Sequence, residues 1–328
     1  MLRSFGLNDH PAGFALALAA MTAAADLAAA QSAPSSRPEP QIVTTSDGVR
    51  LSVVVAGKGP PVLYLHGGPG QASISFEQMG GSALEPFATM HYLDQRGSGR
   101  SDSAADLTLE RMLRDIDEVR RQMGHERIHL LAHSFGGVLA VNYAARYPDH
   151  VAGLILTAAT VHFLSDSLLA YQIAVADSLL GREAAVDPPA NRDSLLGRRD
   201  EARRALNQKD IGYRLLVDSV ATIQTMIALD RSYPRNMQFG ASVMDEPELR
   251  AEYYRDYAEL TASITAPVLV LTGTRDHAIG PRHFMSFRFP NQRVVELNGG
   301  HLFYYENNAG FVEAVRGFLE AQAARDGR

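Results

Sequence analysis

The chain of 328 residues contains no cysteine. This absence excludes disulfide bonds, thiolate metal sites and cysteine nucleophiles, although it leaves the redox compartment undecided. Positive charge is not in excess either, because 31 lysines and arginines stand against 37 aspartates and glutamates and give a formal net charge of −6. Without a dense basic run, the sequence does not indicate a nucleic-acid partner. Hydrophobic residues make up 46% and charged residues 21% of the chain, which is ordinary for a soluble globular protein.

Long hydrophobic runs are also missing. The mostly apolar run at residues 12–25 is shorter than the roughly 20 residues that a bilayer span needs, so we expect no stable membrane span. Alanines at 28–30 follow it, and such a run ending in small residues is typical of a cleavable export signal. We therefore expect residues 1–30 to be a signal peptide and the protein to be periplasmic or secreted; if this segment is not a signal, the protein is cytoplasmic. Three prolines oppose a helix in residues 31–40, which are expected to form a linker.

From residue 41 onward, β-type runs alternate with helical patterns. A hairpin is expected first, around Asp47 and Gly48. Later runs are expected to form strands at 61–66, 90–93, 128–132, 151–159, 267–273 and 293–297, and helices at 109–123, 136–146 and 311–323. This alternation predicts an α/β fold, in which a mostly parallel sheet is covered by helices on both faces.

The alternation stops between residues 162 and 256. This stretch is charged, helix-prone and poor in β-type runs. We interpret it as a helical cap inserted into the sheet domain, which divides the core into residues 41–161 and 257–328.

Ser134 carries the strongest chemical signal. An expected strand leads into it and an expected helix leads out, and the small residues Ala132 and Gly136 flank it at two positions on either side. A nucleophile on a sharp strand-to-helix turn needs small neighbours there, because the backbone passes close to itself. The pattern predicts that Ser134 is a nucleophile and that the Phe135 N–H points at the developing oxyanion.

A nucleophilic serine needs a base and an acid that orients the base. Asp276 lies just beyond the expected strand at 267–273, and His301 just beyond the next strand. Open α/β sheets place their sites at the carboxyl ends of strands, and the order serine, acid, histidine fits this type of fold. We therefore expect Asp276 and His301 to complete a triad with Ser134.

Glycines follow another strand in the sequence HGGPG at residues 66–70. They allow the backbone to turn and bring an N–H close to a reacting carbonyl, and we expect the second oxyanion donor to be Gly68, with Gly67 as the alternative. A phosphate cradle would need a following lysine and hydroxyl residue, which are missing. The sequence DQRGSGRS at residues 94–101 also follows a strand, and its charged side chains are expected to hold that loop together.

The other histidines are weaker candidates for a catalytic or metal-binding role than His301. His125, His129 and His133 have a spacing that could bind zinc only on a helix, but they lie on an expected loop and strand. The side chain of His133 is expected to point away from the nucleophile, and His277 to line the pocket. We expect no metal and no cofactor.

Together these motifs resemble the proline iminopeptidase-like serine hydrolases of the α/β-hydrolase superfamily. The sequences at 66–70 and 94–101, the turn at Ser134, Asp276 and His301 match that pattern in order, from about residue 41 to the end. The resemblance implies an α/β-hydrolase fold with a mostly parallel sheet and an inserted helical cap. Epoxide hydrolases and haloalkane dehalogenases share parts of the layout, but their nucleophile is an aspartate.

Members of this family that remove an N-terminal proline hold the free amine with acidic residues. In this chain His277 follows Asp276, and Gln238 stands before Phe239 where related caps carry an acidic residue. Asp245, Glu246 or Glu248 could substitute for the missing acidic residue. His277, Gln238 and Glu246 are the residues that we expect to bind substrate. If the ammonium group of a substrate were buried without a carboxylate partner, its binding would cost about several kcal/mol, as for other unpaired buried charges.

We expect the partner to be a small molecule or a short peptide, and nothing in the sequence indicates an oligomeric state. The first functional hypothesis is an aminopeptidase that releases N-terminal proline or small apolar residues through an acyl-enzyme intermediate. The alternatives are a carboxylesterase, lactonase or amidase of the same fold, and a non-enzymatic binding protein that keeps the hydrolase fold.

Overall fold

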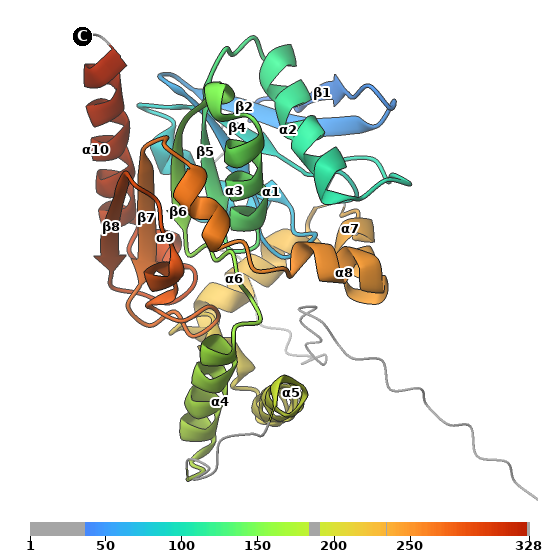
Figure 1. Cartoon of the computed structure of the whole chain (residues 1–328), viewed down its shortest axis with the longest axis vertical. Helices are drawn as coiled ribbons and strands as arrows, with labels where there is room; N and C mark the ends of the chain where they lie inside the picture. The colour runs from blue at the N-terminus through green and yellow to red at the C-terminus, as the bar shows by residue number, and fades with distance from the viewer. Residues whose placement is uncertain (1–36, 184–190, 234, 327–328) are drawn as a thin grey trace, which may run out of the picture. The chain divides into compact units, whose positions relative to one another are not determined.

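The computed structural model describes residues 37–183, 191–233 and 235–326. The predicted signal peptide and most of the predicted linker lie outside these ranges. An eight-stranded sheet runs through the described part in the order β1-β2-β4-β3-β5-β6-β7-β8 (Figure 1). The strands are β1 (Gln41–Thr44), β2 (Arg50–Gly57), β3 (Pro61–Leu65), β4 (Thr89–Leu93), β5 (Ile128–His133), β6 (Val151–Thr157), β7 (Val268–Gly273) and β8 (Gln292–Leu297).

Helices occupy most of the intervening segments. The α-helices are α1 (Ser73–Gln78), α2 (Leu109–Gln122), α3 (Gly136–Arg146), α4 (Asp166–Leu180), α5 (Arg192–Gln208), α6 (Val220–Arg231), α7 (Gln238–Asp245), α8 (Pro247–Tyr253), α9 (Phe303–Glu306) and α10 (Asn308–Asp326). Short 3₁₀ turns are η1 (Gly81–Leu84), η2 (Pro148–His150), η3 (Gly212–Leu215), η4 (Glu259–Ser263) and η5 (His283–Ser286).

The sheet is parallel except at one edge. Strands β1 and β2 form the predicted hairpin, and β2 also pairs antiparallel with β4, whereas β4, β3, β5, β6, β7 and β8 pair in parallel. In the hairpin turn Gly48 has φ 84°, a conformation that glycine adopts without strain. The predicted α/β fold with antiparallel strands at one edge is therefore confirmed.

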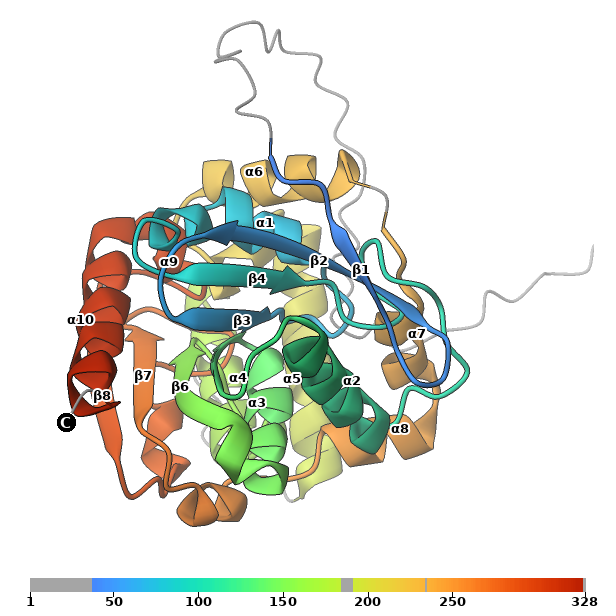
Figure 2. The same cartoon turned by 90° about the horizontal axis from the view of Figure 1, so that it is seen from above.

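Helices cover both faces of this sheet. Helices α2 and α3 lie on one side, and α1 and α10 lie on the other (Figure 2). All six residues of β5 are buried, as expected for a strand covered on both faces. On the α1 side, Phe76 stacks on Tyr64 at 4.0 Å between ring centroids and meets the edges of Tyr304 and Phe311. The central strands are therefore fixed from both faces, and their carboxyl ends can carry a rigid site.

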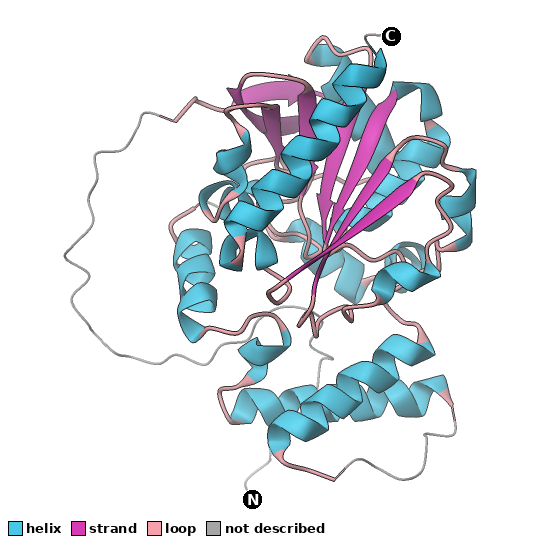
Figure 3. Cartoon of the chain, turned by 90° about the vertical axis from the view of Figure 1, so that its left-hand side faces the viewer, coloured by secondary structure: helices cyan, strands magenta, loops and turns pink. Residues whose placement is uncertain are grey.

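The predicted helical insertion contains α4 to α8. Helices α4 and α5 lie beyond the carboxyl ends of the parallel strands (Figure 3). The two ends of the insertion meet, because the Tyr257 N–H donates to the Val161 carbonyl at 3.0 Å and His162 pairs with Asp256 at 3.0 Å. In the described ranges, no helix combines the length and the apolar character needed to cross a membrane.

Candidate functional site

Ser134 lies on the turn between β5 and α3. Its φ of 52° is unusual for a residue with a side chain, and such strain is characteristic of functional turns. The turn brings two backbone segments close together: a Cβ built on Gly136 would lie 2.3 Å from the Leu65 carbonyl oxygen. The small residue two positions after Ser134 is therefore required by close packing against β3, and Ala132 on the other side is fully buried.

Asp276 and His301 are joined by a hydrogen bond. They follow β7 and β8, and His301 Nδ1 lies 2.9 Å from Asp276 Oδ2. The other carboxylate oxygen, Oδ1, accepts from the N–H groups of Ala278 and Ile279 at 3.0 and 3.2 Å. Burial alone would raise the pKa of Asp276, but His301 and these hydrogen bonds outweigh it and hold the pKa below its ordinary value. The carboxylate is therefore charged at neutral pH and fixes the orientation of the imidazole.

The remaining ring nitrogen of His301 and the Ser134 hydroxyl have no hydrogen-bond partner among the residues that the structure describes. The link between the two residues runs through His133, the last residue of β5. His133 Nε2 lies 3.2 Å from the His301 carbonyl oxygen, and the two imidazole rings are 4.8 Å apart. Serine–histidine hydrogen bonds are often long without substrate and shorten when it binds.

The glycine loop after β3 lies against this turn. A Cβ built on Gly67 would lie 2.9 Å from Ser134 Cβ, so only glycine fits at this approach. Gly68 has φ 118°, and the Gly68–Pro69 peptide is cis. The N–H of Phe135 precedes the first turn of α3, where backbone donors lack partners within the helix. Both predicted oxyanion donors therefore lie in segments next to Ser134.

The loop at residues 94–101 supports the glycine loop. The Gln95 N–H donates to His66 Nε2 at 3.1 Å, and the Gln95 side chain donates to the His66 carbonyl at 3.0 Å. Asp94 accepts from the N–H of Ser73 at 2.8 Å and from the N–H of Arg100 at 2.9 Å. These bonds connect the segments at both ends of the glycine loop to the loop after β4. The bond from the Arg100 N–H to Asp94 agrees with the expectation that charged residues hold loop 94–101 together.

Arg96 anchors the same loop from within the core. Its side chain has no exposed surface, and it donates to both carboxylate oxygens of Asp115 at 2.5 and 2.7 Å. It also donates to Asp47 at 3.0 and 3.1 Å. Burial raises the pKa of Asp115, and the neighbouring guanidinium groups only partly offset this effect. The pair is thus a buried ionic link between loop 94–101, the hairpin and α2.

We predict that Arg96→Met will lower the free energy of unfolding by about 3–5 kcal/mol, because it leaves a buried carboxylate with one partner fewer. Urea unfolding followed by circular dichroism measures this change. The matched control is Arg114→Met on α2, which breaks an exposed pair with Glu110 and should cost less than about 1 kcal/mol. Equal losses in the two variants would contradict an anchoring role for Arg96.

The predicted substrate-binding residues have different surroundings. His277 Nδ1 lies 2.7 Å from the hydroxyl of Tyr171 on α4, and burial lowers the pKa of His277. Gln238 uses both ends of its amide on the backbone of Ala104, with two hydrogen bonds of 2.8 Å. Glu246 is exposed at the start of α8. The Gln238 amide therefore joins α7 to the loop that contains Ala104, and the expectation that His277, Gln238 and Glu246 bind substrate stays a prediction.

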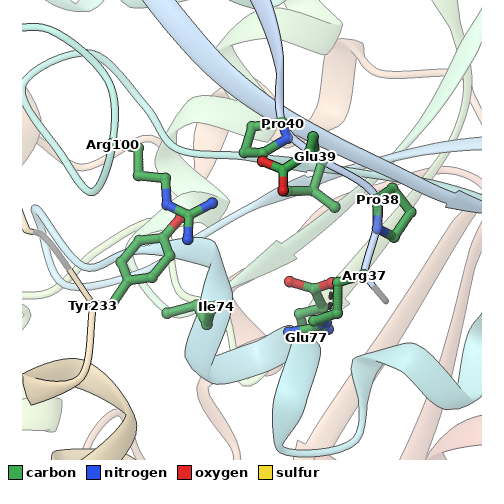
Figure 4. Close-up of a pocket in the computed structure, with 9 residues that line it drawn as sticks. Arg37, Pro38, Glu39, Pro40, Ile74, Glu77, Arg100 and Tyr233 are labelled. Atoms are coloured by element: carbon green, nitrogen blue, oxygen red, sulfur yellow. Dashed lines mark ion pairs between the residues drawn. The ribbon is translucent and has the colours of Figure 1, made fainter. Parts of the chain in front are cut away.

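A separate pocket of about 140 Å³ lies near the first described residues (Figure 4). It contains none of the predicted triad residues, and its lining is Arg37, Pro38, Glu39, Pro40, Val54, Ile74, Glu77, Arg100 and Tyr233. Arg100 lies over the Tyr233 ring at 4.1 Å, and Arg37 pairs with Glu77. Burial raises the pKa of Glu77 to about 7 despite this pair. The Arg37–Glu77 pair connects the first described residues to α1, so this pocket is formed where that segment packs on the helix.

Across the described ranges, no group of three or more histidines and carboxylates could hold a metal ion.

Comparison with known proteins identifies the family. A family model described as alpha/beta hydrolase fold matches residues 60–308. A proline iminopeptidase of Pestalotiopsis fici is 26% identical over 286 residues, which cover 84% of this chain and 97% of that protein. The proline iminopeptidase of Heyndrickxia coagulans is 36% identical over 104 residues, which cover 31% of this chain and 35% of that protein.

Solved structures agree with this assignment. A proline iminopeptidase-related protein from Thermus thermophilus has a TM-score of 0.68 and 27% identity, with 87% of this chain and 98% of that chain covered. An esterase from Exiguobacterium antarcticum has a TM-score of 0.62 and 20% identity, with 85% and 99% covered, and shows the fold alone. The chain belongs to the α/β-hydrolase fold family and is a hydrolase of that type, and it is similar to proteins named proline iminopeptidase.

Proposed function

We propose that this protein is a serine hydrolase in which Ser134, His301 and Asp276 form a catalytic triad. The observation that carries the proposal is the Asp276–His301 hydrogen bond of 2.9 Å beside a serine with φ 52°. Oγ of Ser134 forms a bond to the substrate carbonyl carbon while His301 Nε2 takes its proton. His301 then gives this proton to the leaving amine or alcohol as the old bond breaks, and an acyl-enzyme remains.

Water completes the reaction in the same way. His301 takes a proton from the water as its oxygen attacks the acyl carbon, and it returns that proton to Ser134 when the acid leaves. The N–H groups of Phe135 and Gly68 would bind the oxyanion of each tetrahedral intermediate. Each such donor contributes about 2.7–4 kcal/mol in comparable sites. Asp276 stabilises the imidazolium that forms during both steps.

For the substrate, we propose a peptide from which N-terminal proline or a small apolar residue is released. The support is the likeness over nearly the whole chain to a protein named proline iminopeptidase. A second candidate is an esterase, lactonase or amidase. It is favoured by the surroundings of Gln238 and Glu246, because a substrate ammonium would need a carboxylate partner, whereas Gln238 is an amide that bonds to the Ala104 backbone and Glu246 is exposed.

A panel of chromogenic substrates separates these candidates. We predict that the full-length protein will hydrolyse prolyl and alanyl anilides at least about tenfold faster than N-blocked prolyl anilide, a difference of ~1.4 kcal/mol in transition-state binding. The measured quantity is kcat/KM for each compound and for short- and long-chain acyl esters. Indifference to N-blocking together with faster ester cleavage would favour the esterase. A protein that neither turns over any compound nor reacts with a fluorophosphonate would be the non-enzymatic binder.

A further inference from the structure

His133 is a buried histidine that the proposed mechanism does not use. It directly precedes Ser134 and is only 3% exposed. Its Nε2 contacts the His301 carbonyl at 3.2 Å, and its ring packs against the His301 ring and the edge of Tyr304 at 5.1 Å. The side chain therefore joins the strand that carries the nucleophile to the loop that carries the base.

The direction of this hydrogen bond follows from the chemistry of the two groups. A carbonyl oxygen can only accept, so Nε2 of His133 must carry the proton and donate it. Burial, with a further contribution from His301, lowers the pKa of His133 to about 3, so the ring is neutral at physiological pH. The neutral ring of His133 therefore donates a hydrogen bond to the His301 carbonyl. It places no second positive charge beside the imidazolium that forms during catalysis.

The backbone of His301 is held from the opposite side as well. Its N–H donates to the carbonyl of Leu216, in the cap segment that follows η3, at 2.6 Å. Gly300 passes so close to this segment that a Cβ built on it would lie 2.5 Å from the Leu216 oxygen. The peptide groups of His301 are thus fixed by the cap through the N–H and by β5 through the carbonyl.

We propose that His133 is a positioning residue, which holds the backbone of His301 so that the imidazole can reach Ser134 and Asp276 together. This inference rests on the proposed function, since it assigns His301 the role of base. His133 acts through His301 and does not touch the substrate. A shift of about 1 Å in a catalytic group can cost on the order of 100-fold in rate, so a single backbone hydrogen bond can matter at this place.

The test compares variants that keep or remove the donor. His133→Phe keeps a ring and removes the donor, His133→Gln places an amide N–H near the position of Nε2, and His133→Asn has an amide that is too short to reach. We expect kcat on the best substrate of the panel, and the rate of fluorophosphonate labelling at Ser134, to fall about 10- to 100-fold in the Phe and Asn variants. KM should stay within about threefold, and the Gln variant should recover most of the rate.

The matched control is His91→Phe, which replaces another buried histidine of the same sheet that contacts backbone carbonyls of Val62 and Thr89. It should leave the labelling rate unchanged even if it lowers the melting temperature. If the His133→Phe variant does not fold, the comparison of Gln with Asn carries the test. Wild-type rates in a folded Phe or Asn variant, or a Gln variant as slow as Asn, would overturn the inference. Failure of the wild-type protein to label at Ser134 would instead overturn the proposed function.

Discussion

Replacing Ser134 by alanine should abolish hydrolysis. We expect kcat to fall by about 10⁴-fold or more, because the acyl-enzyme can no longer form and only substrate binding and the oxyanion donors remain. The substitution removes one hydroxyl that has no partner among the described residues, so the fold should be kept. Alanine retains a side chain at φ 52°, and no relief of backbone strain is expected. Steady-state rates on the fastest substrate measure the effect, and circular dichroism verifies the fold.

Two further observations make the Ser134→Ala result decisive. Mass spectrometry after fluorophosphonate treatment should find the adduct on the peptide that contains Ser134 in the wild type and no adduct in the variant. Ser263→Ala is the control, because Ser263 is exposed on η4 and its hydroxyl only donates to the Leu260 carbonyl at 2.8 Å. That variant should keep full rate and full labelling. More than a few per cent of wild-type activity in a clean Ser134→Ala preparation would contradict the acyl-enzyme mechanism.

The position of the candidate site could be predicted from the sequence because its residues follow β-strands directly. Ser134 follows β5, Asp276 follows β7 and His301 follows β8. In a parallel sheet these strand ends lie along one edge, so strand prediction alone is enough to bring the three residues into one region. The same reasoning places the glycine loop there, and the periodic apolar pattern of α2 predicts that helix to within a residue.

Contacts between segments far apart in the chain could not be predicted in this way. The expectation that His133 points away from the nucleophile follows from strand alternation, but alternation does not reveal that the loop of His301 passes on that side. The buried pair of Arg96 and Asp115 joins a loop to a helix and carries no local signal. The hydrogen bonds between the Gln238 amide and the Ala104 backbone likewise become visible only when α7 is placed on the core, and the expectation that Gln238 binds substrate stays a prediction.

Replacing Asp276 by asparagine should lower kcat about 10⁴-fold while the protein stays folded, as the same change does in a comparable triad. The side-chain oxygen of asparagine can still accept from Ala278 and Ile279, so the loop after β7 keeps its two hydrogen bonds. The amide nitrogen then faces His301 Nδ1 and, as a donor, favours the tautomer with the proton on Nε2. In that form His301 cannot take the proton of Ser134, and the imidazolium loses its counter-charge.

The charge of Asp276 also makes the stability of the protein depend on pH. The pKa of Asp276 lies below its ordinary value in the folded protein, so the stabilisation from its charge is present above the unfolded-state pKa and is lost as the pH falls through the folded-state pKa. The Asp276→Asn variant lacks this acid-dependent contribution. The control is Asp218→Asn, which breaks an exposed pair with Arg275 and should keep the hydrolysis rate and the pH profile of the wild type.

A measurement at low temperature, where a destabilised protein is fully folded, separates catalysis from stability. If the rate loss of Asp276→Asn disappeared there, Asp276 would have a role in stability alone. A loss that persists there, with unchanged circular dichroism, identifies the carboxylate as the group that makes His301 a base.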